Sequence, residues 1–123
     1  MSDSSADDAP SDEQQAVPLK WRPGLAVAAN AFAAGDFTLQ SLAGVEPTSA
    51  STASQVREYL ADYGATLVSL PEEAWDSSVC IWSGHHWDVL VDLWTQEEGR
   101  SDLVMHAHVA QSGTVSVHAV YVP

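Results

Sequence analysis

From residue 79 to the C-terminus, apolar side chains occupy every second position, and short turns that contain Gly interrupt this pattern. Such alternation is typical of half-buried β-strands, because successive strand side chains point to opposite faces of a sheet. Short turns join antiparallel neighbours, so the segment predicts a four-stranded antiparallel meander. The predicted strands cover residues 78–83, 86–95, 101–110 and 114–122.

Two helices are expected before the meander. The first is predicted over residues 23–34, where a Pro suits the first turn and apolar residues recur at helical spacing. The second begins at Thr52, which forms a capping-box pattern with Gln55, and it ends at Gly64. Residues 65–70 are either a short strand or an extended connection. A sheet that is apolar on one face must bury that face, so both helices are expected to pack on it in an α+β fold.

The N-terminal segment differs from the rest of the chain in composition. Residues 1–16 contain five acidic residues, no basic residue and, after Met1, no large apolar residue. Such a segment cannot bury enough apolar surface to offset the entropy cost of ordering it. We therefore predict a disordered acidic tail over residues 1–16, followed by a single α+β domain over residues 17–123.

The alternation also assigns side chains to the two faces of the sheet. The odd-numbered residues of the last three strands are expected to point into the core, and Val120 is expected on the opposite face. The register that keeps the apolar faces together places Asp88 opposite His108, and His106 opposite His118. A slip by one residue would move charged side chains into the core.

The face away from the core mixes histidines and aspartates with apolar side chains, and it also carries His86. It is too apolar for ordinary solvent-exposed surface, so we interpret it as a candidate contact surface. The alternative is that the first strand, the long loop before the second helix or a dimer mate covers it. The predicted binding residues are Asp88, Leu90, Asp92, Trp94, Arg100, Asp102, His106, His108 and His118.

Some of these residues have the chemistry of a metal site or of a general acid/base set. They are Asp88, His106, His108 and His118. Opposed strand side chains tend to diverge, and the sequence has no H-E-x-x-H motif and no cysteine pair. We therefore predict no metal, no cofactor and no catalytic residue, and retain a small enzyme or metal-dependent protein as the alternative. His85 and His86 lie next to the turn at Gly84 and are interpreted as surface residues.

The charge balance restricts the partners. The chain has 17 acidic and 4 basic residues, a formal net charge of −13. This charge repels nucleic acid and anionic membranes and favours basic partners, although solubility or a salt-adapted host also explains it.

Cys80 is the only cysteine of the chain and lies in an apolar run, which predicts a buried, unreactive thiol. With no secretory signal pattern and no apolar run of membrane-spanning length, a cytoplasmic location is expected.

Several strings suggest a relationship to a known family. They are AFAAGDF near residue 31, YGATLVSLPEEAW, WDVLVDLWTQEEGRSDLV and the closing VYVP. Through them, residues 24–123 resemble a family of small uncharacterised bacterial domains, a domain of unknown function. The resemblance implies a stand-alone or accessory domain and no transferable activity. It singles out Trp94, Glu98, Arg100 and Asp102 in one hairpin as residues to probe.

Size, acidity, the mixed sheet face and the absence of a catalytic motif favour binding over catalysis. We expect a protein-binding module of the immunity or inhibitor kind, which recognises a protein partner, such as a basic one, through its acidic sheet surface. A homodimer that packs through the same face is a further alternative.

Overall fold

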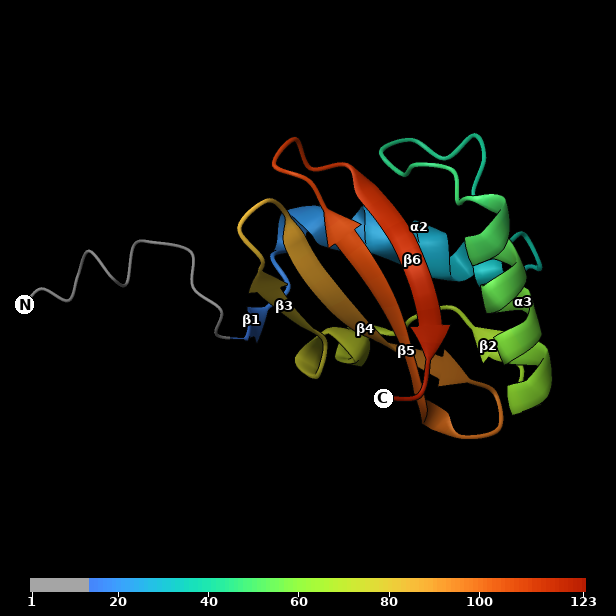
Figure 1. Ribbon diagram of the computed structural model, residues 1–123. Helices are drawn as coiled ribbons and strands as arrows, with labels where there is room; N and C mark the ends of the chain where they lie inside the picture. The colour runs from blue at the N-terminus through green and yellow to red at the C-terminus, as the bar shows by residue number, and fades with distance from the viewer. Residues whose placement is uncertain (1–13) are drawn as a thin grey trace, which may run out of the picture.

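The computed structural model describes residues 14–123, so residues 1–13 of the tail predicted for residues 1–16 lie outside the described part of the chain. The fold is α+β, with helices and a mostly antiparallel sheet (Figure 1). The helical elements are η1 (Leu19–Trp21), α2 (Arg22–Ala33), α3 (Ala50–Tyr63) and η2 (Glu72–Asp76). The strands are β1 (Gln15–Ala16), β2 (Leu67–Val68), β3 (Val79–Trp82), β4 (Trp87–Thr95), β5 (Gly99–Val109) and β6 (Val115–Tyr121).

The described strands form one sheet in the order β1–β3–β4–β5–β6, with β2 also paired to β4. The sequence predicts four strands, and the structure has two more, β1 and β2, of two residues each. Strand β1 corrects the boundary of the tail, because Gln15 and Ala16 pair with Cys80 and Val79 of β3. Two residues before the predicted start of the domain are thus paired into the sheet, and Val17, the predicted first residue, is buried.

Two irregularities shift the register of the sheet. Between β4 and β5, the pairing shifts after Asp92, so Thr95 lies opposite Gly99 and not opposite Ser101. Between β5 and β6, the pairing shifts between His106 and Ala107. His106 lies opposite Ala119, whereas Ala107 lies opposite Val117, so His118 has no partner in β5. His118 is therefore the extra residue of a bulge in β6, and the predicted pair of His106 with His118 is wrong.

The bulge also corrects the predicted faces of β6. One extra residue reverses the alternation of the side chains that follow it. Val120 consequently points into the core and is fully buried, whereas Ala119 and Tyr121 are only partly buried. Before the irregularities the predicted register is confirmed, since Asp88 lies opposite His108, as expected.

The first helix agrees with its apolar pattern. Helix α2 lies across one face of the sheet (Figure 1), and its buried residues are Leu25, Ala28, Ala29 and Phe32. Helix α3 starts earlier than predicted, because the side chain of Ser49, and not that of Thr52, caps it. The Ser49 hydroxyl accepts a hydrogen bond from the Thr52 N–H at 3.1 Å. Gly64 ends α3 in the left-handed conformation, with φ of 81°, as expected.

Gln55 bonds to the sheet and takes no part in a helix cap. Its side-chain amide donates to the Val120 carbonyl at 2.8 Å and accepts from the Val120 N–H at 3.1 Å. The Tyr59 hydroxyl accepts from the Val122 N–H at 3.1 Å. Helix α3 thus lies beside β6 and bonds the backbone of this edge strand (Figure 1), whereas both helices were expected on one face. Side chains that satisfy an edge strand also block its pairing with another chain.

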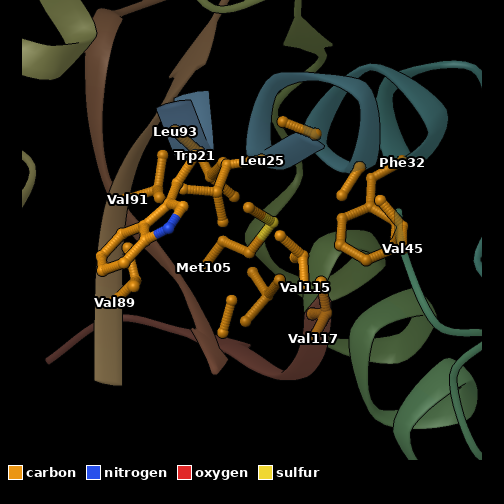
Figure 2. Close-up of a cluster of buried hydrophobic side chains, with 14 of the residues drawn as sticks. Trp21, Leu25, Phe32, Val45, Val89, Val91, Leu93, Met105, Val115 and Val117 are labelled. Atoms are coloured by element: carbon orange, nitrogen blue, oxygen red, sulfur yellow. The ribbon is translucent and has the colours of Figure 1, made fainter. Parts of the chain in front are cut away.

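The core lies between α2 and the face of the sheet that we call the inner face (Figure 2). The opposite, outer face carries Asp88, Leu90, Asp92 and Trp94 of β4, together with the side chains beside them on β5. The labelled core residues are Trp21, Leu25, Phe32, Val45, Val89, Val91, Leu93, Met105, Val115 and Val117. Among the described residues, the helices are too short or too polar to cross a membrane.

Candidate functional site: a cluster of histidines and an aspartate

Four of the five histidines of the chain gather on the outer face, beside one carboxylate. We define the histidine cluster as His86, Asp88, His106, His108 and His118. His86 directly precedes β4, Asp88 lies in β4, His106 and His108 lie in β5, and His118 is the bulge residue of β6.

The strand geometry explains why these side chains meet. Residues at positions i and i+2 of a strand share a face, which puts His86 beside Asp88, and His106 beside His108. The register of β4 and β5 then places Asp88 directly opposite His108. The bulge keeps His118 on the same face, although the pattern of β6 reverses after it.

One oxygen of Asp88 is the centre of the cluster. The Asp88 Oδ1 atom lies 3.0 Å from His106 Nε2, 3.0 Å from His108 Nε2 and 3.4 Å from His86 Nε2. The side chains of these residues are 25–31% exposed, so water and ions reach them from the outer face. Three imidazole nitrogens therefore converge on a single carboxylate oxygen.

The imidazole rings also stack on one another. The His108 ring contacts the His86 ring and the His118 ring, each with a centroid separation of 3.8 Å. The His106 ring lies edge-on to His108 at 5.2 Å. Ser116 Oγ and His118 Nε2 share a hydrogen bond of 3.1 Å. The stack joins the turn before β4 to the bulge of β6, across β5.

This environment favours the neutral forms of His108 and His118 and the ionised form of Asp88. Burial, followed by the nearby His118 and His86, lowers the pKa of His108 from 6.5 to about 4. Partial desolvation, followed by His106, also lowers the pKa of His118, although this side chain is exposed overall. Burial acts to raise the pKa of Asp88, but the His106 hydrogen bond and the three neighbouring histidines outweigh it and lower that pKa.

The spacing of the potential ligand atoms suits a metal ion. The ligand atoms of His86, Asp88 and His108 all lie within 4.8 Å of one another. Nitrogen and oxygen ligands about 2.0–2.2 Å from zinc, at a tetrahedral angle, lie about 3.3–3.5 Å apart. The distances of 3.0 and 3.4 Å from Asp88 Oδ1 to the two imidazole nitrogens are close to that spacing. Opposed strand side chains were expected to diverge, and here they converge.

The remaining predicted residues do not join the cluster. Trp94 lies six residues beyond Asp88 in β4, a distance of about 20 Å along a strand, and Arg100 lies opposite Trp94. Asp102 lies in β5, two residues after Arg100, and its side chain is exposed. Between the two ends, the Ser77 hydroxyl donates to the Asp92 carboxylate, and Leu90 is partly buried. The nine predicted residues therefore spread along the outer face, with Asp88 and the histidines at one end, Trp94, Arg100 and Asp102 at the other, and Leu90 and Asp92 between them.

The hairpin that the resemblance singles out has a structural role at Glu98. The Tyr63 hydroxyl donates to the Glu98 carboxylate at 2.8 Å, and the Thr95 hydroxyl donates to it at 3.0 Å. These bonds tie the end of α3 to the turn between β4 and β5.

Cys80 is buried, and its burial raises the pKa of the thiol, which agrees with the predicted unreactive cysteine.

His86 is the residue of the cluster that sequence reasoning left out of the predicted site. The double histidine beside Gly84 suggested surface residues, and His85 is indeed exposed. The signal that identifies His86 is its position two residues before Asp88, on the face already assigned to the other histidines.

The part of the chain that contains the histidine cluster matches a known family. The chain matches the family described as Domain of unknown function (DUF7668) over residues 29–123, and it belongs to this family, as the resemblance indicates. No curated protein and no solved structure matches the chain.

Proposed function

We propose that this protein binds a divalent transition metal of the zinc type at the histidine cluster and acts as a metal-dependent protein. The observation that carries the proposal is the convergence of three imidazole Nε2 atoms within 3.0–3.4 Å of Asp88 Oδ1. Imidazole and carboxylate together are a common ligand set for zinc and its neighbours. This geometry supports the metal-dependent alternative over the binding module that the sequence favours.

In this proposal, His86, Asp88 and His108 are the ligands, and His106 is next in position to complete the set. A metal requires a neutral imidazole and an ionised carboxylate, because protons compete for the same lone pairs. The lowered pKa values of His108 and Asp88 keep both groups in that state at neutral pH. The protein therefore does not have to release a proton from either group before the metal binds.

Isothermal titration of the untagged full-length protein with zinc sulfate at pH 7.5 tests the proposal. We expect saturable binding with one zinc ion per chain. His86→Ala should weaken that binding by about tenfold or more, because even residues that only orient metal ligands contribute factors of this size. His85→Ala is the matched control, since this neighbouring histidine is exposed and lies outside the cluster.

The three histidine variants distinguish a specific metal site from non-specific binding. Equal loss of zinc affinity in His85→Ala and His86→Ala, or no saturable binding at all, would refute the metal site. Loss in His86→Ala and His108→Ala, with normal binding in His85→Ala, would support it. Circular dichroism of each variant checks that the fold is retained.

A second candidate function is recognition of a basic protein segment at the other end of the outer face. It is favoured by Trp94, whose side chain lies on the outer face and is only partly buried. Trp94 borders a hollow that is also lined by Glu73, Asp76 and Arg100. Tryptophan is enriched among residues that dominate binding energy, and the net charge of −13 favours a basic partner. An immunity or inhibitor protein would use such a surface.

Affinity capture from the native host at low and moderate salt tests this second function, with Trp94→Ala as the comparison. We expect a stoichiometric basic partner that is lost when the salt concentration rises and that Trp94→Ala captures poorly. A partner retained equally by Trp94→Ala and at high salt would contradict recognition at this end. Light scattering of the free protein tests the alternative in which the outer face pairs with a second copy.

A further inference from the structure

Three tryptophans meet at one end of the sheet, away from the histidine cluster's outer surface. Trp82 ends β3 and lies opposite Trp87 at the start of β4, with ring centroids 5.3 Å apart. Trp21 of η1 lies 5.5 Å from Trp87, near Val89 at the edge of the core (Figure 2). Trp21 is buried, whereas Trp82 and Trp87 are only partly buried. The indoles therefore form a wall that solvent reaches.

The tryptophans line a cleft with a volume of about 490 Å³. Clefts of about 300–1,000 Å³ with aromatic walls and few polar groups are typical of small-ligand sites. The polar side chains of the cleft come from Lys20 and from the turn between β5 and β6, at Gln111 and Ser112. Among the described residues, no carboxylate lines it.

The geometry of the rings favours a compact cation over a flat ligand. The planes of Trp21 and Trp87 are inclined by 53°, and those of Trp82 and Trp87 by 58°. Inclined rings present π faces from different directions, whereas a sugar or an aromatic ring stacks best on a flat platform. The faces of indole rings are negative and attract cations within about 6 Å.

The chain already places one cation against this wall. The Lys20 ammonium nitrogen lies 5.7 Å from the centroid of the Trp21 ring, and the Lys20 side chain is exposed. The net charge of −13 also attracts cations to the protein from solution. Lys20 thus places a positive charge beside the cleft, where it would compete with a bound cation.

We propose that this cleft binds a quaternary ammonium group, with Trp82 and Trp87 as its walls. A primary ammonium ion has three N–H donors, which lose hydrogen bonds to water when it enters a site without carboxylates. A quaternary ammonium ion has no N–H donor, so its transfer to an aromatic cleft costs less. Such groups occur on free choline-like molecules and on trimethylated lysine side chains of proteins, and both share this chemistry.

Titration of the full-length protein with choline chloride, followed by tryptophan fluorescence, tests the proposal. Sodium chloride at equal ionic strength is the salt control, and 3,3-dimethylbutan-1-ol is the neutral molecule of matched shape. A cation–π contribution of about 1–2 kcal/mol corresponds to about 5- to 30-fold tighter binding of choline than of the neutral alcohol. Equal binding of the two molecules would overturn the proposal, because the cleft would then be merely apolar.

Variants of the cleft test the location and the sign of the charge. Lys20→Ala removes an exposed side chain and a competing cation, so it should tighten choline binding. Weaker choline binding in Lys20→Ala would contradict the proposal and indicate a site for anions. Trp82→Leu should weaken choline binding by about fivefold or more, and unchanged binding in a folded Trp82→Leu protein would place choline elsewhere.

A peptide carrying trimethyllysine, compared with the same unmodified peptide, identifies the natural source of the cation. If the modified peptide binds about tenfold more tightly than choline and the unmodified peptide does not bind, the cleft recognises trimethylated lysine in a protein. If the modified peptide binds no more tightly than choline, the cleft serves a free small cation. If neither ligand binds, the proposal fails.

Discussion

The two faces of the sheet use the same strands for different purposes. The inner face is covered by α2, and its side chains, such as Val89, Val91 and Leu103, are fully buried. The outer face carries Asp88, His106 and His108, whose side chains stay about one-quarter to one-third exposed. Consecutive residues along β4, and along β5, therefore differ in role, because alternation sends every second side chain to the opposite face.

The comparison teaches that stability and chemistry are separated in this fold. Apolar contacts on the inner face contribute the free energy of folding, and they leave the outer face free to gather titratable groups. Four imidazoles close together gain little from one another when neutral and repel when protonated. The proposed metal site would account for their assembly.

The largest expected effect comes from paired leucine truncations on the two faces. Leu103→Ala on the inner face should lower the free energy of unfolding by about 2–5 kcal/mol, because it leaves a cavity. Leu90→Ala on the partly exposed outer face should cost about 1 kcal/mol. Urea unfolding of both variants measures the difference, and equal costs would break the distinction between the faces.

Acid should destabilise the protein through the outer face. The folded pKa of His108 is about 4, below its ordinary value of 6.5, so the unfolded state binds the extra proton first. The contribution of His108 to stability is therefore fully present above about pH 7 and is lost as the pH drops from 6.5 towards 4. The lowered pKa of Asp88 acts in the same direction below about pH 4.

A His108 shift of this size corresponds to about 3 kcal/mol, and solvent at a partly exposed ring reduces it to about 1–2 kcal/mol. Urea unfolding at pH 7.5 and pH 4.5 measures the loss, with His108→Gln as the comparison. The other titratable groups near the stack are His86, Asp88, His106, His118 and Glu46, and they remain in this variant. An unchanged loss in His108→Gln would show that His108 does not cause it.

The edge of the sheet offers a test that involves neither face. Gln55→Ala removes both hydrogen bonds to the Val120 backbone, so it should cost about 1–2 kcal/mol of unfolding free energy. Hydrogen exchange should also become faster at the Val120 amide. Gln96→Ala, an exposed glutamine in the turn between β4 and β5, is the control and should change stability by less than about 0.5 kcal/mol.

The smallest expected effect is that of His86→Ala in metal-free buffer, where stability should change by less than about 0.5 kcal/mol. With zinc at about 100 times its dissociation constant, the unaltered protein should gain about 2.7 kcal/mol, and His86→Ala should gain little. Thermal unfolding with zinc and with EDTA measures both values. A large loss in EDTA would mean that His86 serves stability and not metal binding.

Much of the fold could be predicted from the sequence, because its signals are local. The period-two pattern located β3 to β6, and the buried residues of α2 follow the predicted helical spacing. The errors arise where a distant contact changes the role of a residue. Thr52 with Gln55 forms a capping pattern, but Ser49 caps α3 and Gln55 bonds to Val120, 65 residues away.

The candidate site was predicted only in part for the same reason. Asp88, His106, His108 and His118 were placed on one face correctly, since residue type and strand parity are properties of the chain itself. The convergence of His86, His106 and His108 on a single oxygen was not predicted, because it depends on side-chain directions across strands. Trp94 and Arg100 were grouped with the histidines although the length of β4 separates them.

By itself, the sequence determined the α+β class, most strands and the division of the β4 and β5 side chains between two faces. Local periodicity is sufficient for these features, because each depends on near neighbours in the chain. Only the tertiary structure decided the bulge at His118, the bonds from Gln55 to β6 and the meeting of three tryptophans at one end of the sheet. These features depend on strand register and on packing between distant segments, and both are set by the whole folded chain.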